Sequence, residues 1–484
     1  MTAVATPDVA AWTRWRRETA TLARLSLAER AQTGKRLRAA VPREAHAGFS
    51  LPPGRDPVGL LLSQAESRVP ELVPVRHGRM LVSPFSYYRG AALPMAADLA
   101  GTPTTGILVQ ACGDAHLSNF GLFGTAERNL VFDINDFDES LPGPWEWDVK
   151  RLAASLEVAG RENGYSRKER RRITRGCAGR YRAAMREFAM MSNLDVWYAQ
   201  PSAEDLRTRL EPLLSKRQKK VVAKAVAKAQ TRDSMQATGK LTQMVDGQAR
   251  IIADPPLIVP LAELLPEELD RAGFEAQLDQ LIGKYRRSLP AERRTLLEQY
   301  NYMDMARKVV GVGSVGTRCW IVLFTGHDQT DPLLLQVKEA PPSALSEFAG
   351  PAKQNNQGHR VVTGQRILQA AGDIFLGWLR ASGLDGGSYD FYVRQLRDWK
   401  YSFLIETMAP AGLLYYGQTC AWTLARGHAR SGDRTAIAAY LGGSGVFDDA
   451  IAEFASAYAD QNERDYAALG EAVSAGRVTA APVV

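Results

Sequence analysis

A β-rich stretch lies in the middle of a chain that is otherwise patterned for helices. Residues 308–324, KVVGVGSVGTRCWIVLF, combine spaced glycines with a run of β-branched and aromatic residues, and a second apolar run, PLLLQVKEA, follows at 332–340. Such runs predict strands. Helical patterns cover roughly 148–230 and 262–308 before this stretch. The arrangement predicts an α+β protein.

The pattern after the central strands is mixed. It predicts a helix near 361–380, a short strand near 389–396 and further helices up to about residue 470. The last residues, AGRVTAAPVV, are expected to fray.

The composition is that of an ordinary globular protein of 484 residues, with 45% hydrophobic and 23% charged residues. The N-terminal residues are too interrupted by charge for a signal peptide, and no apolar run reaches the length of about 18 residues that a membrane span needs. Four scattered cysteines without metal-ligand spacing suit free thiols in a reducing compartment. We therefore expect a cytoplasmic protein with no membrane span.

Positive charge is concentrated in one block. Residues 161–232 hold 19 Lys and Arg against 7 Asp and Glu, whereas the whole chain carries only +7. This block could bind an anionic partner or form a solvated helical face, and the second interpretation is favoured because basic runs alone discriminate poorly. A nucleic-acid partner is not expected, since no zinc-finger, RRM or recognition-helix pattern accompanies the charge.

Polar side chains follow two strand-like runs. Asp114, His116 and Asn119 come directly after GILVQACG, and Asp136 and Asp138 end the run RNLVFDIND. If the strands pair as a hairpin, these side chains converge. Asn119 and Asp136 then provide the oxygen ligands that Mg²⁺ prefers, with Asp138 as a further ligand or a support. Asp114 stays free to accept a proton, and His116 is a second catalytic candidate.

The central stretch contains G-x-G-x-x-G at Gly311, Gly313 and Gly316, with Ser314 between them. A dinucleotide-binding fingerprint needs a helix after the glycines, but a β-type run follows here, so a hairpin over nucleotide phosphates is the better interpretation. Lys338 lies in the next strand, where a lysine needs an anionic partner such as a phosphate.

These motifs together resemble those of aminoglycoside phosphotransferases and related kinases. GDAHLSN resembles the catalytic loop G-D-x-H-x-x-N, NDFDE the metal-binding segment I-D-F-D, and WEWDVKRLA the following W-D-L-A. The resemblance implies a two-lobed kinase-like fold that binds Mg-ATP and transfers the γ-phosphoryl group. Asp114 would be the base, Asn119 and Asp136 the Mg²⁺ ligands, and Lys338 with the glycines would hold the phosphates. The segment after 389–396 would be the adenine-binding hinge, with Gln395 and Leu396 at the nucleotide.

The order of the motifs differs from that of kinases, because the catalytic loop precedes the glycine loop. LARGHA at 424–429 resembles the kinase helix that normally leads into the catalytic loop, so the order implies a circular permutation. The expected parts are these: a helical accessory segment at 1–100, the catalytic and metal-binding part of the helical lobe at 101–300, the β-rich nucleotide-binding lobe at 301–400 and helices completing the helical lobe at 401–484. Assembly of the site from two chains would also satisfy this order.

Over nearly its full length the chain also resembles a bacterial family known only as a domain of unknown function. The matching stretches include QACGDAHLSNFG, DINDFDESLPGPWEWDVKRL and KVVGVGSVGTR. This resemblance implies membership of the family but no activity.

Several choices stay open at this point. The carboxylate partner of Lys338 is not evident, with Glu347 as the nearest candidate. Arg79 and Arg89 could bind an anionic substrate or pair with the acidic cluster. The phosphoryl acceptor is open, and so is nucleotidyl transfer with the same residues.

Two other functions are weighed. A metal-dependent phosphoesterase also uses a G-D-x-H motif, but it needs further histidine motifs that the six histidines do not form. A nucleotide-binding pseudokinase or scaffold is the other, and the intact Asp114, Asn119, Asp136 and Lys338 argue against it.

Overall fold

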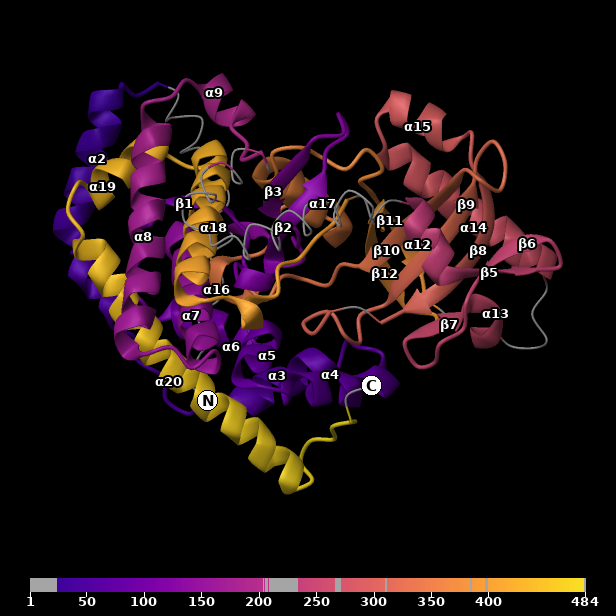
Figure 1. Cartoon of the computed structure of the whole chain (residues 1–484), viewed down its shortest axis with the longest axis horizontal. Coiled ribbons are helices and arrows are strands. Elements are labelled where there is room, and N and C mark those ends of the chain that lie inside the picture. Colours follow the sequence, from indigo (N-terminus) through magenta and orange to yellow (C-terminus); the bar gives the residue numbers. More distant parts are fainter. Residues whose placement is uncertain are drawn as a thin grey trace.

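The structure is a computed structural model of an α+β protein, which confirms the predicted fold class (Figure 1). It describes residues 24–202, 204, 208, 234–265, 271–309, 311–383, 385–396 and 399–482. Long helices gather on one side of the molecule and the largest sheet lies on the other, with the short helices of residues 57–100 below them (Figure 1).

The largest sheet has six antiparallel strands in the order β11-β12-β10-β9-β8-β7. The strands are β7 (Ile258–Pro260), β8 (Asn301–Lys308), β9 (Cys319–Thr325), β10 (Pro332–Glu339), β11 (Gly377–Ser382) and β12 (Ser388–Gln395). β9, β10 and β12 confirm the predicted strands. β8 differs from the prediction, since its residues lie at the end of a stretch expected to be helical.

The prediction of a helix near 361–380 is wrong for the second half of that range. α17 (Gln357–Leu368) ends early, and β11 begins nine residues later. A turn separates them, in which the Asp373 side chain accepts the amide of Phe375 at 2.7 Å. The alternating burial of β11 is typical of a strand, and pairing with β12 decides its conformation.

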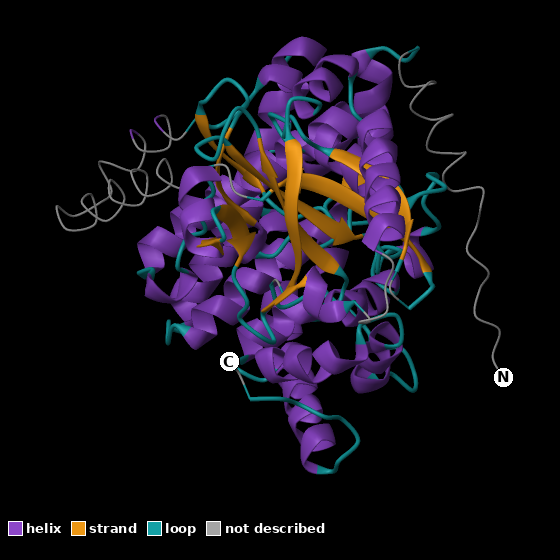
Figure 2. Cartoon of the chain, turned by 90° about the vertical axis from the view of Figure 1, so that its right-hand side faces the viewer, coloured by secondary structure: helices purple, strands orange, loops and turns teal. Residues whose placement is uncertain are grey.

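Both faces of the sheet are covered, and Figure 2 shows its strands surrounded by helices. One face packs against α14 (Arg271–Ser288) and α15 (Ala291–Leu297) through an apolar cluster that includes Tyr285 and Phe324. The other face packs against α12 (Ser234–Leu241) and the hairpin of β5 (Thr242–Val245) and β6 (Gln248–Ile251). α13 (Leu261–Leu264) follows β7. Residues 234–265 and 271–300, grouped with the catalytic loop in the expected division, therefore belong to or pack on the sheet.

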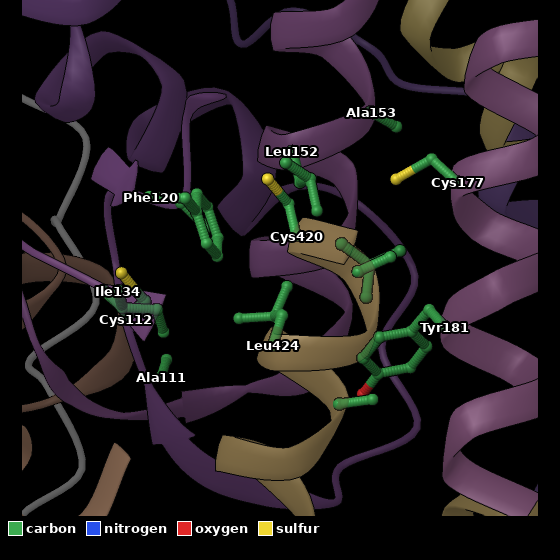
Figure 3. Close-up of a cluster of buried hydrophobic side chains, with 14 of the residues drawn as sticks. Ala111, Cys112, Phe120, Ile134, Leu152, Ala153, Cys177, Tyr181, Cys420 and Leu424 are labelled. Carbon is green, nitrogen blue, oxygen red and sulfur yellow. The ribbon is translucent and has the colours of Figure 1, made fainter. Parts of the chain in front are cut away.

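The helical side has its own core. Its main helices are α7 (Trp145–Glu162), α8 (Arg167–Ala189), α18 (Pro410–Ser431), α19 (Arg434–Leu441) and α20 (Val446–Ser474). Two short strand pairs lie against them: β1 (Leu108–Ala111) with β4 (Leu141–Pro144), and β2 (Phe120–Gly124) with β3 (Leu130–Ile134). Figure 3 shows Leu424 of α18 among side chains from α7, α8 and the strand pairs. All four cysteines are free, as predicted, and all four are buried.

The N-terminal part forms short helices. They are α2 (Leu27–Ala40), α3 (Pro57–Ala65), α4 (Val73–Met80), α5 (Pro84–Gly90) and α6 (Ala92–Ala100), and the remaining short helices are α9 (Asn193–Tyr198) and α16 (Ser346–Ala349). The expected fraying of the C-terminal tail is wrong for its described residues. Val478 is buried, and the Ala481 amide donates to the Pro74 carbonyl at 2.8 Å.

The first half of the basic block is a helical face paired with acidic residues. Arg161 at the end of α7 contacts Asp460 at 2.7 Å, and Arg171 and Arg175 of α8 contact Asp449 at 3.0 and 2.9 Å, so both helices pair with α20. The lysine-rich stretch 215–232 lies outside the described residues. Within the described residues, no helix is both long enough and apolar enough to cross a membrane.

Candidate functional site

The loop after β1 is shaped by one glycine and one buried carboxylate. Gly113 has a φ of +81°, and a Cβ at this position would lie 2.3 Å from the Glu139 carbonyl oxygen, so no other residue fits. The Asp148 carboxylate at the start of α7 accepts the amides of Cys112 at 2.6 Å and Gly113 at 2.9 Å. Nε2 of His428 in α18 lies at hydrogen-bond distance, 3.0 Å, from the same Asp148 carboxylate.

Asp114 is held in place by three neighbours. Its Oδ1 accepts from Arg151 Nε at 2.6 Å, and its carbonyl accepts from the Asn119 side-chain amide at 2.8 Å. His116 Nδ1 accepts the Ser118 amide at 3.2 Å, which leaves the proton on Nε2, 3.6 Å from Asp114 Oδ2. Burial lowers the pKa of His116 to about 3, so this imidazole is neutral beside Asp114.

The two strand-like runs do not pair with each other as supposed, because β1 pairs with β4. A hairpin of β2 and β3 instead places Asn119, just before β2, and Asp136, just after β3, at one cavity. The Asn135 amide donates to the Asn119 carbonyl at 2.8 Å, at the open end of the hairpin. The side-chain nitrogen of Asn119 donates to the Asp114 carbonyl, so the side-chain oxygen of Asn119 is the atom available as a metal ligand. Burial raises the pKa of Asp136, but Lys338 and other nearby cations outweigh that effect and hold it below its ordinary value.

Asn119 and Asp136 could supply some, but not all, of the ligands of a magnesium ion. Within the described residues, no three His, Cys, Asp or Glu side chains group as a metal site. The Asn119 amide oxygen and the Asp136 carboxylate are the donors present, and Mg²⁺ commonly takes its other ligands from waters and substrate phosphates. The donor chemistry therefore fits Mg²⁺ bound together with a phosphate.

Lys338 of β10 finds its carboxylate partner in the acidic cluster. Its Nζ bonds the Asp138 carboxylate and lies 3.8 Å from Asp136 Oδ2. Tyr392 of β12 donates to Asp138 Oδ1 at 2.7 Å. Burial alone would lower the pKa of Lys338, but the two carboxylates hold it well above its ordinary value. Glu347, the candidate from sequence, is exposed on α16.

The glycine loop between β8 and β9 reaches the same place. Gly311 and Gly316 have φ angles of +59° and +90°, and the Ser314 hydroxyl donates to Asp138 Oδ2 at 3.2 Å. One cavity of about 90 Å³ joins the two motif sets. Of the residues predicted from sequence, it is lined by Asp114, His116, Asn119, Asp136, Asp138, Gly311, Gly313 and Ser314.

The N-terminal helices wall this cavity. Arg68, Arg76 and Arg89 line it, and the Val69 amide donates to the Gly316 carbonyl at 2.7 Å. Arg79 donates to the Gly311 carbonyl at 2.8 Å. The sequence did not decide the roles of Arg79 and Arg89. In the structure Arg79 bonds the glycine loop, and Arg89 lines the cavity.

Gln395 and Leu396 line a different cavity. Its volume is about 460 Å³, and it lies between the end of β12, α17 and the β2–β3 turn. Lys400 also lines it, and burial together with Arg394 lowers the pKa of Lys400 to about 7. The structure thus does not bring the predicted hinge residues into the cavity of the glycine loop.

Several supporting residues are absent from the sequence-based prediction. Asp148, Arg151, Tyr392 and Arg76 each touch or line the site from another element. Asp148 lies in the W-D segment that the resemblance singled out, so that segment was an available signal. Arg151 lies in the same quoted segment, WEWDVKRLA, whereas Tyr392 and Arg76 sit in ordinary strand and helical patterns that carry no mark of a site.

Comparisons with known proteins identify the chain only at the level of a family. No curated protein and no solved structure matches it. A family model described as "Uncharacterized protein conserved in bacteria (DUF2252)" matches residues 68–472, a range that contains every residue of the site described above. The chain therefore belongs to this bacterial family of uncharacterized proteins.

Proposed function

We propose that this protein is a Mg-ATP-dependent phosphotransferase with a circularly permuted kinase-like fold. The observation that carries the proposal is the cavity shared by Asp114, Asn119 and Asp136 with a glycine loop almost two hundred residues further along the chain. A base, two oxygen donors and a glycine loop are the parts that phosphoryl transfer to a hydroxyl requires.

The connectivity of the large sheet supports this proposal. β8, the glycine loop, β9, β10 with Lys338, α17, β11 and β12 follow one another along the chain. Protein kinases likewise place a glycine loop before a lysine-bearing strand and a helix after that strand. One difference is that Lys338 pairs with Asp138 rather than with a helix carboxylate.

The end of α18 supports the permuted order. The Gln110 amide of β1 donates to the Ser431 hydroxyl at 2.9 Å, and a Cβ on Gly432 would lie 3.0 Å from the Leu108 carbonyl oxygen. The helix that would lead into the catalytic loop in a kinase thus ends beside the strand that leads into it here. Its His428 also supports that loop through Asp148.

The proposed reaction uses few residues. Asp114 accepts the proton of the acceptor hydroxyl, the new O–P bond forms at the γ-phosphorus, and the bond to the ADP oxygen breaks. Arg151 fixes Oδ1 of Asp114, which leaves Oδ2 for the proton. Lys338 and the glycine loop orient the phosphates, and Asn119 and Asp136 would hold Mg²⁺, which neutralises phosphate charge.

The phosphoesterase alternative has less support. Besides His116, three histidines of the described residues are buried, and each has a structural partner: His46 bonds the Tyr440 hydroxyl, His77 the Thr479 carbonyl and His428 the Asp148 carboxylate. None of these three lines the cavity of Asp114.

Titration calorimetry with ATP, with and without Mg²⁺, tests the proposal. We expect magnesium-dependent binding to the wild type that weakens about tenfold or more in Asp136→Asn and in Lys338→Ala, because each loses a charged contact. Ser314→Ala tests the glycine loop, and we expect it to weaken binding less than the other two variants because it removes an uncharged hydroxyl. Asp449→Asn on α20 is the matched control, since it removes an aspartate remote from the cavity, and its binding should equal that of the wild type.

The outcomes are distinct. If the wild type releases ADP from ATP and a folded Asp114→Asn variant does not, the protein turns ATP over as well as binding it. Absence of ATP binding by a folded wild-type protein would overturn the proposal. Binding that neither Asp136→Asn nor Lys338→Ala weakens would overturn the assignment of the site.

A further inference from the structure

Three arginines line the candidate cavity without a carboxylate partner. Arg68 follows α3, Arg76 lies in α4 and Arg89 in α5. Arg76 is only 1% exposed. No salt bridge within the described ranges of the chain involves any of the three.

Their hydrogen bonds are incomplete. Arg76 Nη2 donates to Gln64 at 3.0 Å and to the Gly90 carbonyl at 2.9 Å, but its Nε and Nη1 have no partner among the residues that the structure describes. The Nε atoms of Arg68 and Arg89 are also buried without a partner. A buried guanidinium with unpaired donors is costly, and such groups are ordinarily paired with an anion.

The carboxylates of the cavity are already engaged. Asp114 accepts from Arg151, and Asp138 accepts from Lys338. Glu139 accepts a backbone amide at 2.5 Å. The cavity therefore has an acidic part with partners of its own and a basic part in which several donors are unused.

Close packing holds the arginines in position. A Cβ on Gly316 would lie 3.1 Å from the Cβ of Arg68, and a Cβ on Gly313 would lie 3.2 Å from the Arg89 carbonyl oxygen. Arg68 Nη1 also donates to the Val315 carbonyl at 2.5 Å. Because the glycine loop and the arginines are packed together, the donors are preorganised for a ligand.

We infer that Arg68, Arg76 and Arg89 bind a phosphate group of the phosphoryl acceptor. The acceptor would then be a phosphorylated small molecule that also has a free hydroxyl. This inference rests on the proposed function. Guanidinium groups suit phosphate oxygens because they present several N–H donors in a fixed plane. The arginines line the cavity together with the glycine loop, so the bound oxyanion would lie next to the nucleotide phosphates.

Calorimetry with inorganic phosphate as the probe tests the inference, with acetate at equal ionic strength as the singly charged comparison. Each titration is run alone and with Mg-ADP present, so that the nucleotide phosphate site is occupied in the second series. Arg89→Gln and Arg68→Gln are the test variants because both side chains are only half-buried. Arg171→Gln on α8 is the charge-matched control, and circular dichroism checks folding.

We expect phosphate to bind more tightly than acetate, and to bind about tenfold or more weakly in each test variant, since a hydrogen bond to a charged group is lost. Binding of Mg-ADP should stay within about threefold of the wild type in the same variants. Arg171→Gln should match the wild type in both titrations.

Other outcomes separate the two proposals. Phosphate binding unchanged in folded Arg89→Gln and Arg68→Gln would overturn the inference and leave the proposed function standing. Loss of nucleotide binding in these variants to the same extent as phosphate binding would also overturn it, because the arginines would then serve the nucleotide. Arginine-dependent phosphate binding by a wild type that binds no nucleotide would overturn the proposed function and support the oxyanion site.

Discussion

Gly113 illustrates how single residues shape this site. Its φ of +81° belongs to the left-handed region, and the Glu139 carbonyl leaves no space for a side chain. The residue places the following Asp114 at the cavity while its own amide is bound by Asp148.

Replacing Gly113 by alanine separates strain from steric overlap. We expect Gly113→Ala to lower the free energy of unfolding clearly more than Gly164→Ala. The control glycine has a φ of +72° but open space around its Cβ position, so alanine there costs only the conformational penalty of about 1–2 kcal/mol. Urea unfolding of both variants measures the difference, and equal losses would contradict the role assigned to the Glu139 contact.

At the scale of elements, a buried ion pair ties α18 to β3. Arg426 Nη2 donates to both carboxylate oxygens of Asp133, at 2.6 and 2.7 Å, and both side chains are fully buried. The Ala370 amide donates to the same carboxylate at 2.7 Å. Asp133 thus joins α18, β3 and the end of α17, and its role is structural.

Arg426→Met should be strongly destabilising because it leaves Asp133 buried with its charge unpaired. We expect a loss of about 3–5 kcal/mol in the free energy of unfolding. The control Arg171→Met breaks an exposed pair with Asp449 and should cost less than about 1 kcal/mol. Urea unfolding followed by circular dichroism measures both, and similar losses in the two variants would show that burial of the pair does not matter.

At the scale of the whole molecule, buried histidines make stability depend on pH. Burial lowers the pKa of His46 from 6.5 to about 3, and its ring bonds the Tyr440 hydroxyl at 2.7 Å. As pH falls below 6.5, the unfolded chain takes up a proton at this residue while the folded protein does not. The free energy of unfolding therefore decreases as pH falls from about 6.5 to 3, by about 1.4 kcal/mol per pH unit for this group.

Replacing His46 by glutamine should make the stability less sensitive to acid, because the variant has no proton to take up on unfolding. Urea midpoints measured between about pH 7 and 4 give the slope. The exposed His327 provides the control, and His327→Gln should retain the wild-type slope. An unchanged slope in His46→Gln would contradict the predicted contribution.

The sequence by itself determined the features that depend on local pattern. Alternating and β-branched runs predicted β9, β10 and β12, and scattered cysteines predicted free thiols. The approach of Asn119 and Asp136 was predicted, but from the wrong strand pair: β1 pairs with β4, and the hairpin of β2 and β3 brings the two residues to one cavity. Motif strings also sufficed to place the chain in its bacterial family.

Only the tertiary structure decided which distant groups meet. The pairing of Lys338 with Asp138 spans 200 positions and the hydrogen bond of Arg68 to Val315 spans 247, and no local pattern specifies such contacts. For the same reason β11 was predicted as helix, since its strand conformation comes from pairing with β12. Local propensity determines single elements, whereas burial and charge compensation between elements determine the site.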